Sequence, residues 1–197
     1  MAPGSLLQYA DELLAFATEH GLGLFRASAL VCRGWCLAAL GRAEEGISVL
    51  TAGLASLGEL GVKIWRPCIL TLLGDARRMD GQWPAALKHF AEARHLAEET
   101  EDRWCQAETA RLSGDVLVAM GDRTGAEASY HETIAIAQEQ SAKLWELRAA
   151  ASLARLWRDR GRLAEARDLL APVYGWFTEG FGTPDLKEAK ALLDELG

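Results

Sequence analysis

Glycine stands at residues 41, 81, 121 and 161 of this 197-residue chain, a spacing of forty residues repeated three times. Neighbouring columns keep the same register, because a small residue follows each glycine by five places and a large apolar residue follows it by nine. A fixed period between about twenty and fifty residues is typical of stacked supersecondary units, each burying its hydrophobic face against the next. The chain is therefore expected to fold as an array of repeats.

The segments on either side of each glycine have the apolar spacing of helices, and the glycine is expected to end the first one in a left-handed conformation. Gly34, Gly74 and Gly114 fall inside the first helices. There glycine costs about 1 kcal/mol relative to alanine. A cost repeated at one column indicates that two helices approach closely, with a large residue such as Phe90 or Tyr130 filling the remaining space.

These columns resemble the tetratricopeptide repeat. The resemblance rests on a small residue in the first helix, a glycine in the turn, and an alanine followed by an aromatic residue in the second helix, namely Gly74, Gly81, Ala86 and Phe90, then Gly114, Gly121, Ala126 and Tyr130. The family unit has about 34 residues, and the unit is longer here. The resemblance implies an all-α fold, an α-solenoid of about four helical hairpins.

We expect a single superhelical domain over residues 1–197. Residues 5–20 read as a lone extra helix, equivalent to the second half of a repeat, so the chain is expected to be part of a longer protein. Thr183 and Pro184 open a C-terminal capping helix at 184–196. The hairpins are expected at 24–60, 64–100, 104–140 and 144–177.

Composition argues against several classes of protein. The net charge is −7, with basic and acidic residues interleaved, so nucleic acid is not an expected partner. No apolar run approaches the roughly 18–20 residues of a membrane span, and no secretory leader is recognised. The four cysteines fall at different repeat columns, which favours reduced thiols in a cytoplasmic protein: Cys32, Cys36, Cys68 and Cys105.

Two short patterns could indicate metal or redox chemistry. Cys32 and Cys36 are one helical turn apart, and Glu92 and His95 have the Glu-x-x-His spacing of di-iron bundles. Neither pattern has the second ligand pair that such a site requires. No nucleophile with a base, acid–base pair or phosphate-binding loop stands beside them. We expect no enzyme activity, no cofactor and no metal.

In the resembled family, four columns of each first helix line the concave face, which binds the partner. Carried over by register, the groove in this chain comprises Ser28, Val31, Trp35, Ala38, Cys68, Thr71, Asp75, Arg78, Glu108, Arg111, Asp115, Val118, Arg148, Ala151, Arg155 and Arg158. This surface runs from apolar through mixed charge to basic, which suits a protein or peptide with a hydrophobic anchor and an acidic end. The alternative is a solvated face with internal ion pairs, each worth about 0–1 kcal/mol.

Three tryptophans, Trp65, Trp104 and Trp145, open successive first helices at nearly equivalent positions. Their repetition favours packing between repeats. Trp35 departs from the column pattern and is the candidate aromatic anchor for a partner, with a packing role as the alternative.

The C-terminal residues 169–196 are similar to the end of large bacterial signalling proteins, in which a class III nucleotide cyclase domain and an AAA-type ATPase module precede a helical-repeat tail. The similarity implies a sensor or scaffold tail with such a module as its attached partner. We therefore expect a non-catalytic protein- or peptide-binding scaffold or regulatory domain. The alternative is a sensor that encloses a small molecule or signal peptide near Trp35 and Cys68; a homodimer also stays open.

Overall fold

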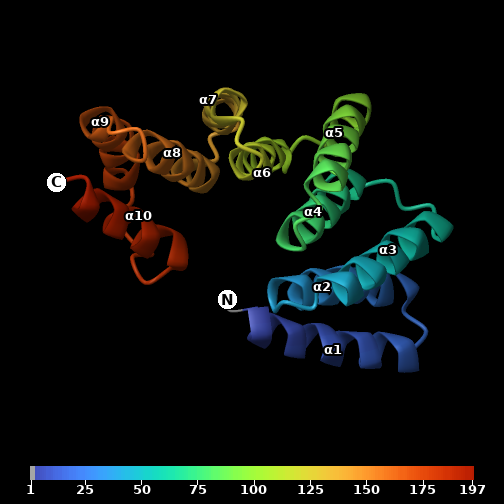
Figure 1. Cartoon of the computed structure of the whole chain (residues 1–197). Helices are drawn as coiled ribbons and strands as arrows, with labels where there is room; N and C mark the ends of the chain where they lie inside the picture. The colour runs from blue at the N-terminus through green and yellow to red at the C-terminus, as the bar shows by residue number, and fades with distance from the viewer. Residues whose placement is uncertain (1–2) are drawn as a thin grey trace. The chain divides into compact units, whose positions relative to one another are not determined.

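The computed structural model describes residues 3–197, over which the backbone forms ten α-helices and no strand (Figure 1). The helices are α1 (Pro3–Glu19), α2 (Gly23–Ala39), α3 (Ala43–Glu59), α4 (Arg66–Met79), α5 (Trp83–Thr100), α6 (Gln106–Ala119), α7 (Arg123–Glu139), α8 (Lys143–Arg158), α9 (Leu163–Gly175) and α10 (Pro184–Glu195). The chain divides into two compact units, with unit 1 ending at Cys105 and unit 2 beginning at Gln106.

The turns between helices repeat at half the interval that the glycines suggest. Left-handed backbone occurs at residues 21, 41, 61, 81, 101, 121, 141 and 161, an interval of twenty residues. At Gly41, for example, φ is 84°, and the following amide of Arg42 donates to the carbonyl of Leu37 at 2.9 Å. This is the hydrogen bond that closes a helix C-terminus in the Schellman motif. The expected left-handed glycine at the end of each first helix is confirmed.

Close contact between paired helices explains the glycines inside the first helices. A Cβ added at Gly74 would lie 2.4 Å from the Phe90 ring, and one at Gly114 would lie 2.6 Å from the Tyr130 ring. At Gly34 the obstacle is the backbone of the facing helix, with the Leu50 nitrogen at 2.6 Å. An ordinary side chain therefore cannot be accommodated at these positions without separating the helices.

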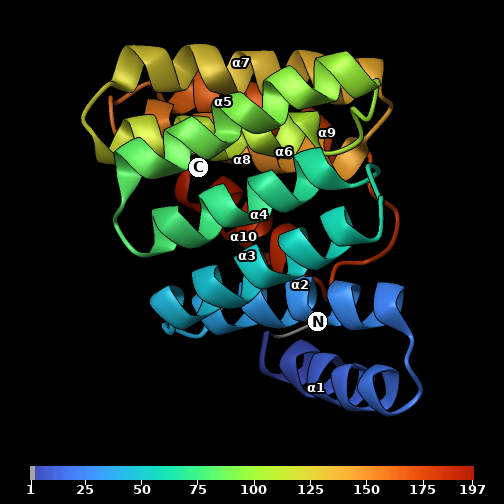
Figure 2. The ribbon, with the colours of Figure 1, turned by 90° about the vertical axis from the view of Figure 1, so that its right-hand side faces the viewer.

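Unit 1 contains α1–α5, with α2 paired to α3 and α4 paired to α5 as antiparallel hairpins (Figures 1 and 2). Its core is built from aliphatic side chains that the two hairpins and the α2–α4 contact bury, including Leu50, Leu57, Ile69, Leu70 and Leu73. Half-buried side chains such as Trp35 and Leu72 pack around this core. The first helices α2 and α4 thus lie next to each other within one hydrophobic layer.

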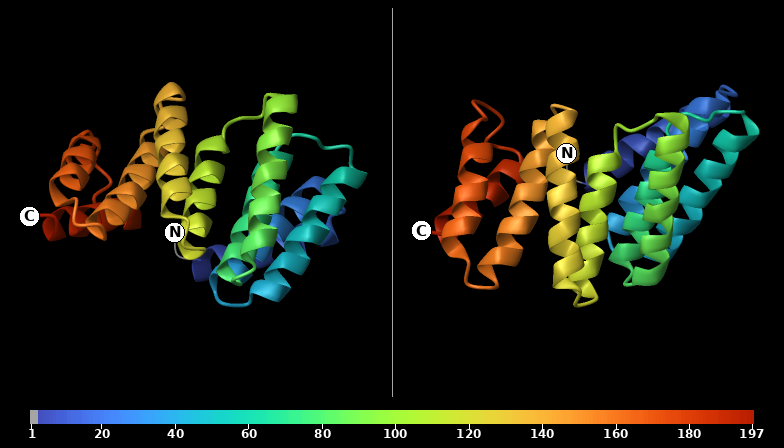
Figure 3. Two further views of the ribbon diagram at one scale, coloured as in Figure 1. Left: turned by 45° about the horizontal axis from the view of Figure 1, so that its top comes forward. Right: turned by 90° about the horizontal axis from the view of Figure 1, so that it is seen from above.

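Unit 2 contains α6–α10, in which α6 pairs with α7 and α8 with α9 (Figures 1 and 3). The last helix, α10, packs on both α8 and α9, and its Leu186, Ala189 and Leu192 are buried in the unit 2 core. An all-α fold of successive hairpins, with an additional helix at each end, is confirmed as an α-solenoid class. The single domain over residues 1–197 stays a prediction.

Candidate functional site

Unit 1 contains an open apolar pocket of about 260 Å³ on the face of its first helices. Ser28, Val31 and Cys68, all at expected groove columns, contribute to its wall. The rest of the lining is almost entirely apolar and comprises Cys32, Leu57, Trp65, Ile69, Leu72 and Trp104. The only hydroxyl in the lining, that of Ser28, donates to the carbonyl of Leu24 at 3.0 Å. The pocket therefore offers apolar contact rather than strong polar recognition.

Two half-exposed tryptophans form part of the pocket wall, Trp65 with 41% of its surface accessible and Trp104 with 51%. Trp65 has a left-handed backbone conformation with φ of 69°, and its amide donates to Asp102 at 2.8 Å. This hydrogen bond ties the turn before α4 to the segment that carries Trp104. The repetition of tryptophan favoured packing between repeats, and about half of the surface of each of these two residues stays accessible.

Cysteine thiols also lie at this pocket, and all four cysteines are free. A hydrogen bond with the Cys105 thiol, together with burial, raises the pKa of Cys68 well above its ordinary value. Burial likewise raises the pKa of Cys32. Because the thiolate is the nucleophilic form, a raised pKa disfavours nucleophilic chemistry at these thiols, which contribute small polarisable groups to the wall. Over residues 3–197, no group of three or more potential side-chain ligands is placed to hold a metal ion.

Trp35 lies next to this pocket in a polar network of its own. Its indole Nε1 donates to Asp75 Oδ2 at 2.9 Å, which joins residues forty apart at the same repeat column. Asp75 is buried and also accepts from Arg78, with Nη2 to Oδ1 at 2.7 Å. Thr71 is buried and donates to the Pro67 carbonyl at 2.9 Å. Trp35 is thus half-buried and held in place, which matches the packing role more closely than that of a free anchor.

Unit 2 presents a different surface at the corresponding columns. Arg111 donates to both carboxylate oxygens of Glu108, at 2.7 and 2.8 Å, and to Asp115 Oδ2 at 2.7 Å. Asp115 also accepts from the Tyr130 hydroxyl at 2.8 Å, which links the first helix to its partner helix. Burial alone would lower the pKa of Arg111, but these hydrogen bonds and charges outweigh it and raise the pKa. Burial and the neighbouring Asp115 raise the pKa of Tyr130.

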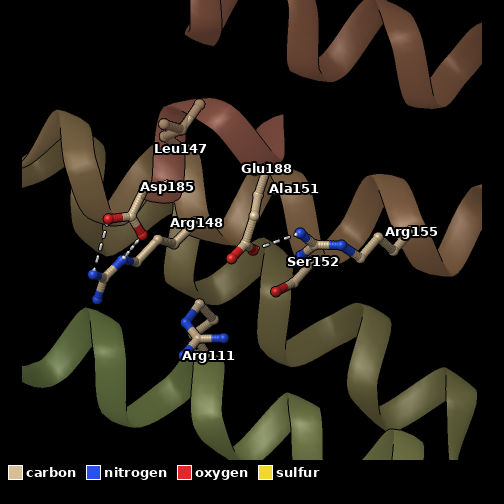
Figure 4. Close-up of a pocket in the computed structure, with 8 residues that line it drawn as sticks. All are labelled: Arg111, Leu147, Arg148, Ala151, Ser152, Arg155, Asp185 and Glu188. Atoms are coloured by element: carbon tan, nitrogen blue, oxygen red, sulfur yellow. Dashed lines mark hydrogen bonds and ion pairs between the residues drawn. The ribbon is translucent and has the colours of Figure 1, made fainter. Parts of the chain in front are cut away.

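The three remaining groove arginines pair with acidic residues of α10. Arg148 Nε lies 2.5 Å from Asp185 Oδ1, Arg155 Nη2 lies 3.1 Å from Glu188, and Arg158 Nη1 lies 2.5 Å from Glu195. Figure 4 shows Asp185 facing Arg148 and Glu188 reaching Arg155 across a pocket of about 190 Å³. Arg111 and Ser152 also line this pocket.

The arginines of this unit 2 pocket have their carboxylate partners within the unit. Arg148 Nη1 is 3.4 Å from Glu108 as well as being bonded to Asp185, so one arginine connects α6, α8 and α10. Each of the three arginines that line the pocket is therefore paired: Arg111 with Glu108 and Asp115, Arg148 with Asp185, and Arg155 with Glu188. The basic surface expected from the sequence is neutralised by α10, in line with the alternative of internal ion pairs.

The expected groove residues thus form two separate groups. In unit 1, Trp35, Asp75 and Arg78 form one network, and Cys68 lines the apolar pocket beside it. In unit 2, Arg111 and the carboxylates that it binds belong to a network of ion pairs that includes Arg148 of α8 and Asp185 of α10. The pocket tryptophans and the α10 acids were not among the expected site residues. Their sequence signals were the recurring tryptophan column and the charged pattern of residues 184–196.

No helix over residues 3–197 is both long enough and apolar enough to cross a lipid bilayer. We expected no enzyme activity, no cofactor and no metal. These three expectations stay predictions.

Comparison with known proteins supports the repeat assignment. Residues 65–139 match the model of the tetratricopeptide repeat family, and no curated protein matches the chain. Among solved structures, the chain is similar to BtubC (BKLC) from P. vanneervenii, with a TM-score of 0.72 and 14% identity over 100% of this chain and 90% of that one.

Two other solved structures share the fold. The Rap protein complexed with Competence and Sporulation Factor has a TM-score of 0.66 and 17% identity, over 96% of this chain but only 57% of the Rap chain. MamA has a TM-score of 0.52 and 17% identity, over 96% of this chain and 87% of its own. At these identities the similarity concerns the fold alone. The resemblance to the tetratricopeptide repeat is therefore confirmed for residues 65–139, within a chain whose fold is that of known helical-repeat proteins.

Proposed function

We propose that this chain is a non-catalytic scaffold that binds a protein or peptide, and that the apolar pocket of unit 1 receives an apolar side chain of that partner. The observation that carries the proposal is the pocket itself, which lies on the first-helix face and has two half-exposed tryptophans in its wall. Tryptophan is enriched among the few interface residues that supply most of the binding energy. The fold supports the proposal, since the solved Rap structure of the same architecture holds a bound factor.

The size of the pocket favours a side-chain anchor over a metabolite. Pockets for drug-sized small molecules have volumes of about 300–1,000 Å³. The volume here is about 260 Å³, and the wall lacks the set of convergent polar groups that would orient a polar metabolite. One aromatic or branched aliphatic side chain, presented by a polypeptide, fits these features better than a free ligand.

The proposal can be tested by selecting binders from a displayed library of random peptides. The expected binders share one large apolar residue. Their affinity should fall at least about tenfold for the variant Trp104→Ala, which removes part of the wall, and for Cys32→Trp, which fills the pocket from its exposed side. Trp83→Ala provides a matched control, because Trp83 is also partly exposed in unit 1 but lies outside the pocket.

Two results would count against this function. The first is a set of binders without a common apolar residue. The second is an equal affinity loss for Trp83→Ala and Trp104→Ala. Stabilisation of the chain by a small aromatic compound, with no peptide selected, would instead favour a small-molecule sensor.

The wider context is also part of the proposal. We infer, from the resemblance that the sequence of residues 169–196 has to the tails of bacterial cyclase–ATPase proteins, a regulatory role next to such a module in the cytoplasm. Joining the chain to a cyclase domain of that class and measuring nucleotide formation with and without a selected peptide tests this role. Peptide-independent activity would contradict it.

A further inference from the structure

The final helix of unit 2 combines an apolar stripe with a row of carboxylates. Leu186, Ala189, Leu192 and Leu196 are buried against α8 and α9. Beside this stripe, Asp185, Glu188 and Glu195 each reach a different arginine of α8. The stripe supplies hydrophobic contact, and the carboxylates set the register of the helix along α8.

The register shows how α10 lies on α8. Arg148 pairs with Asp185 and Arg158 pairs with Glu195, and both pairs are 37 residues apart in sequence. The third pair, Arg155 with Glu188, is 33 residues apart. The partners in all three pairs advance together along the two helices, so the helices run in the same direction. The α6–α8 pair is joined similarly, by Arg148 and Glu108, 40 residues apart. Thus α10 lies beside α8 as the next first helix of the array would.

We propose that the α8 face of unit 2 is a binding site for an acidic amphipathic helix, that α10 is its built-in occupant, and that a partner helix of the same pattern displaces α10. The proposal rests on the scaffold function above and names the class of partner for unit 2. Such a helix has apolar residues at the spacing of Leu186, Ala189, Leu192 and Leu196. Its carboxylates stand at the spacing of Asp185, Glu188 and Glu195.

Replacement of α10 by a partner helix costs little free energy, because the partner makes the same contacts that α10 gives up. The ion pairs that α10 makes are partly exposed, with carboxylate side chains 24%, 66% and 57% accessible at Asp185, Glu188 and Glu195. Exposed ion pairs are individually weak. The segment joining α9 to α10 contains Gly180 and Gly182, and its Trp176 and Phe181 are exposed. The contacts that hold this segment are the packing of Phe177 on the unit 2 core and the ring contact between Phe181 and Tyr174.

Geometry favours an acidic helix over a single small anion. Arg148 and Arg158 are ten residues apart on α8, a distance of about 15 Å along a helix that rises 1.5 Å per residue. One phosphate or carboxylate cannot span that row. With α10 in place, each arginine that lines the pocket already has a carboxylate partner, Asp185 for Arg148, Glu188 for Arg155, and Glu108 with Asp115 for Arg111, which disfavours an added anion. A row of carboxylates on one helix face matches the arginine row.

The test uses the full chain and a fluorescent synthetic peptide of residues 183–197 as the probe. In a triple variant carrying Asp185→Asn, Glu188→Gln and Glu195→Gln, the resident helix loses its ion pairs and competes less well. The probe should therefore bind this variant about tenfold more tightly than it binds the unaltered chain. Asp194→Asn is the matched control, since Asp194 pairs only with Lys190 of the same helix and should leave probe affinity unchanged.

Two further measurements keep the test decisive if the triple variant is destabilised. A probe with the same three acids changed to amides should bind the unaltered chain more weakly than the acidic probe. Hydrogen exchange of the amides in 184–195 should speed up in the unaltered chain when the acidic probe is in excess. Equal binding of both probes, or unchanged exchange, would overturn the proposal. The variant Trp104→Ala should not affect the probe, which separates this test from that of the unit 1 pocket.

Discussion

The first helices of the two units share repeat columns but present different chemistry. In unit 1, Cys68 and Thr71 occupy two of these columns, and the adjacent surface opens into an apolar pocket. Forty residues later, in unit 2, Glu108 and Arg111 occupy the same columns and belong to a network of ion pairs. The unit 1 surface leaves apolar area exposed, whereas the charges of the unit 2 surface are paired with one another and with its last helix.

The difference shows that a repeat column determines where a side chain lies but not whether it is available. Asp75 and Asp115 occupy the same repeat column, and each accepts a hydrogen bond within its unit. Asp75 accepts from Trp35 in unit 1, and Asp115 accepts from Tyr130 in unit 2. The neighbouring columns decide whether the face binds a partner or stabilises the unit. Recognition is therefore expected where the columns are apolar and uncovered, and stability is expected to depend on the columns that are charged and paired.

The largest expected contrast is between two tryptophans. Trp157 in unit 2 is 8% accessible, donates to Glu127 at 2.6 Å and stacks under the Arg162 guanidinium, 4.3 Å from its ring centre. Trp157→Ala should lower the free energy of unfolding by about 3–5 kcal/mol. Trp104→Ala in unit 1 should cost less, about 2 kcal/mol, because half of that residue is already exposed. Urea denaturation of both variants measures the contrast, and similar losses would contradict it.

The next contrast compares one column in the two units. Arg111→Met leaves the Glu108 and Asp115 carboxylates without their shared cation, and all three side chains are at most 25% accessible. The expected loss of stability is about 3 kcal/mol. Thr71→Val removes a buried hydroxyl and should cost about 1 kcal/mol. The same denaturation assay applies. A larger loss for the threonine variant would show that the charged network does not stabilise unit 2.

Much of the fold could be predicted from the sequence because its key constraints lie in the backbone. Left-handed turns and close helix contacts accept few residues, so Gly41 and Gly74 stand out at their columns. The twenty-residue interval was missed because Glu101 and Ser141 take the left-handed conformation in two of the turns. That conformation costs a non-glycine residue only about 1–2 kcal/mol, which tertiary contacts can offset.

The candidate sites were harder to predict because they depend on how particular segments are placed. The accessibility of Trp65 and Trp104 follows from the turns that carry them, including the hydrogen bond from Trp65 to Asp102. The pairing of Arg155 depends on where α10 docks, and a list of charges does not contain that information. The repeat register in the sequence predicted which residues occupy equivalent positions. Which of those side chains are exposed, and which partners they bind, could be learned only from the structure.

A smaller expected effect is a pH dependence of stability that arises at one repeat position in unit 1 and is missing at the equivalent position in unit 2. Burial and the neighbouring Arg77 lower the pKa of His89 in unit 1 from its ordinary 6.5, and its Nδ1 atom has no hydrogen-bond partner. The unfolded chain therefore takes up this proton more readily, so stability should be unaffected at high pH and fall as the pH drops through 6.5. In unit 2 the equivalent residue is Ser129, which does not titrate in this range.

Hydrogen exchange at pH 7.5 and pH 5.5 can measure this effect in each unit. His89→Gln should reduce the acid-induced loss of protection in unit 1 and leave unit 2 unchanged. His95→Gln is the control, because the His95 side chain is 73% accessible. An equal response to both substitutions would show that His89 does not carry the pH dependence.

The smallest expected effect tests whether the turns between hairpins are equivalent in the two units. Glu101 in unit 1 has φ of 58° and Ser141 in unit 2 has φ of 54°, where the other turns of the twenty-residue series have glycine. Substitution by glycine removes a left-handed cost of about 1–2 kcal/mol but adds about 0.4–1 kcal/mol of unfolded-chain entropy. A net gain of about 0.5 kcal/mol is therefore expected for each variant in thermal or urea unfolding. Asparagine, which tolerates this conformation, should give a gain of the same sign. A gain at Ser141 together with a loss at Glu101 would indicate that the turn beside the unit 1 pocket depends on its side chain as well as on its backbone.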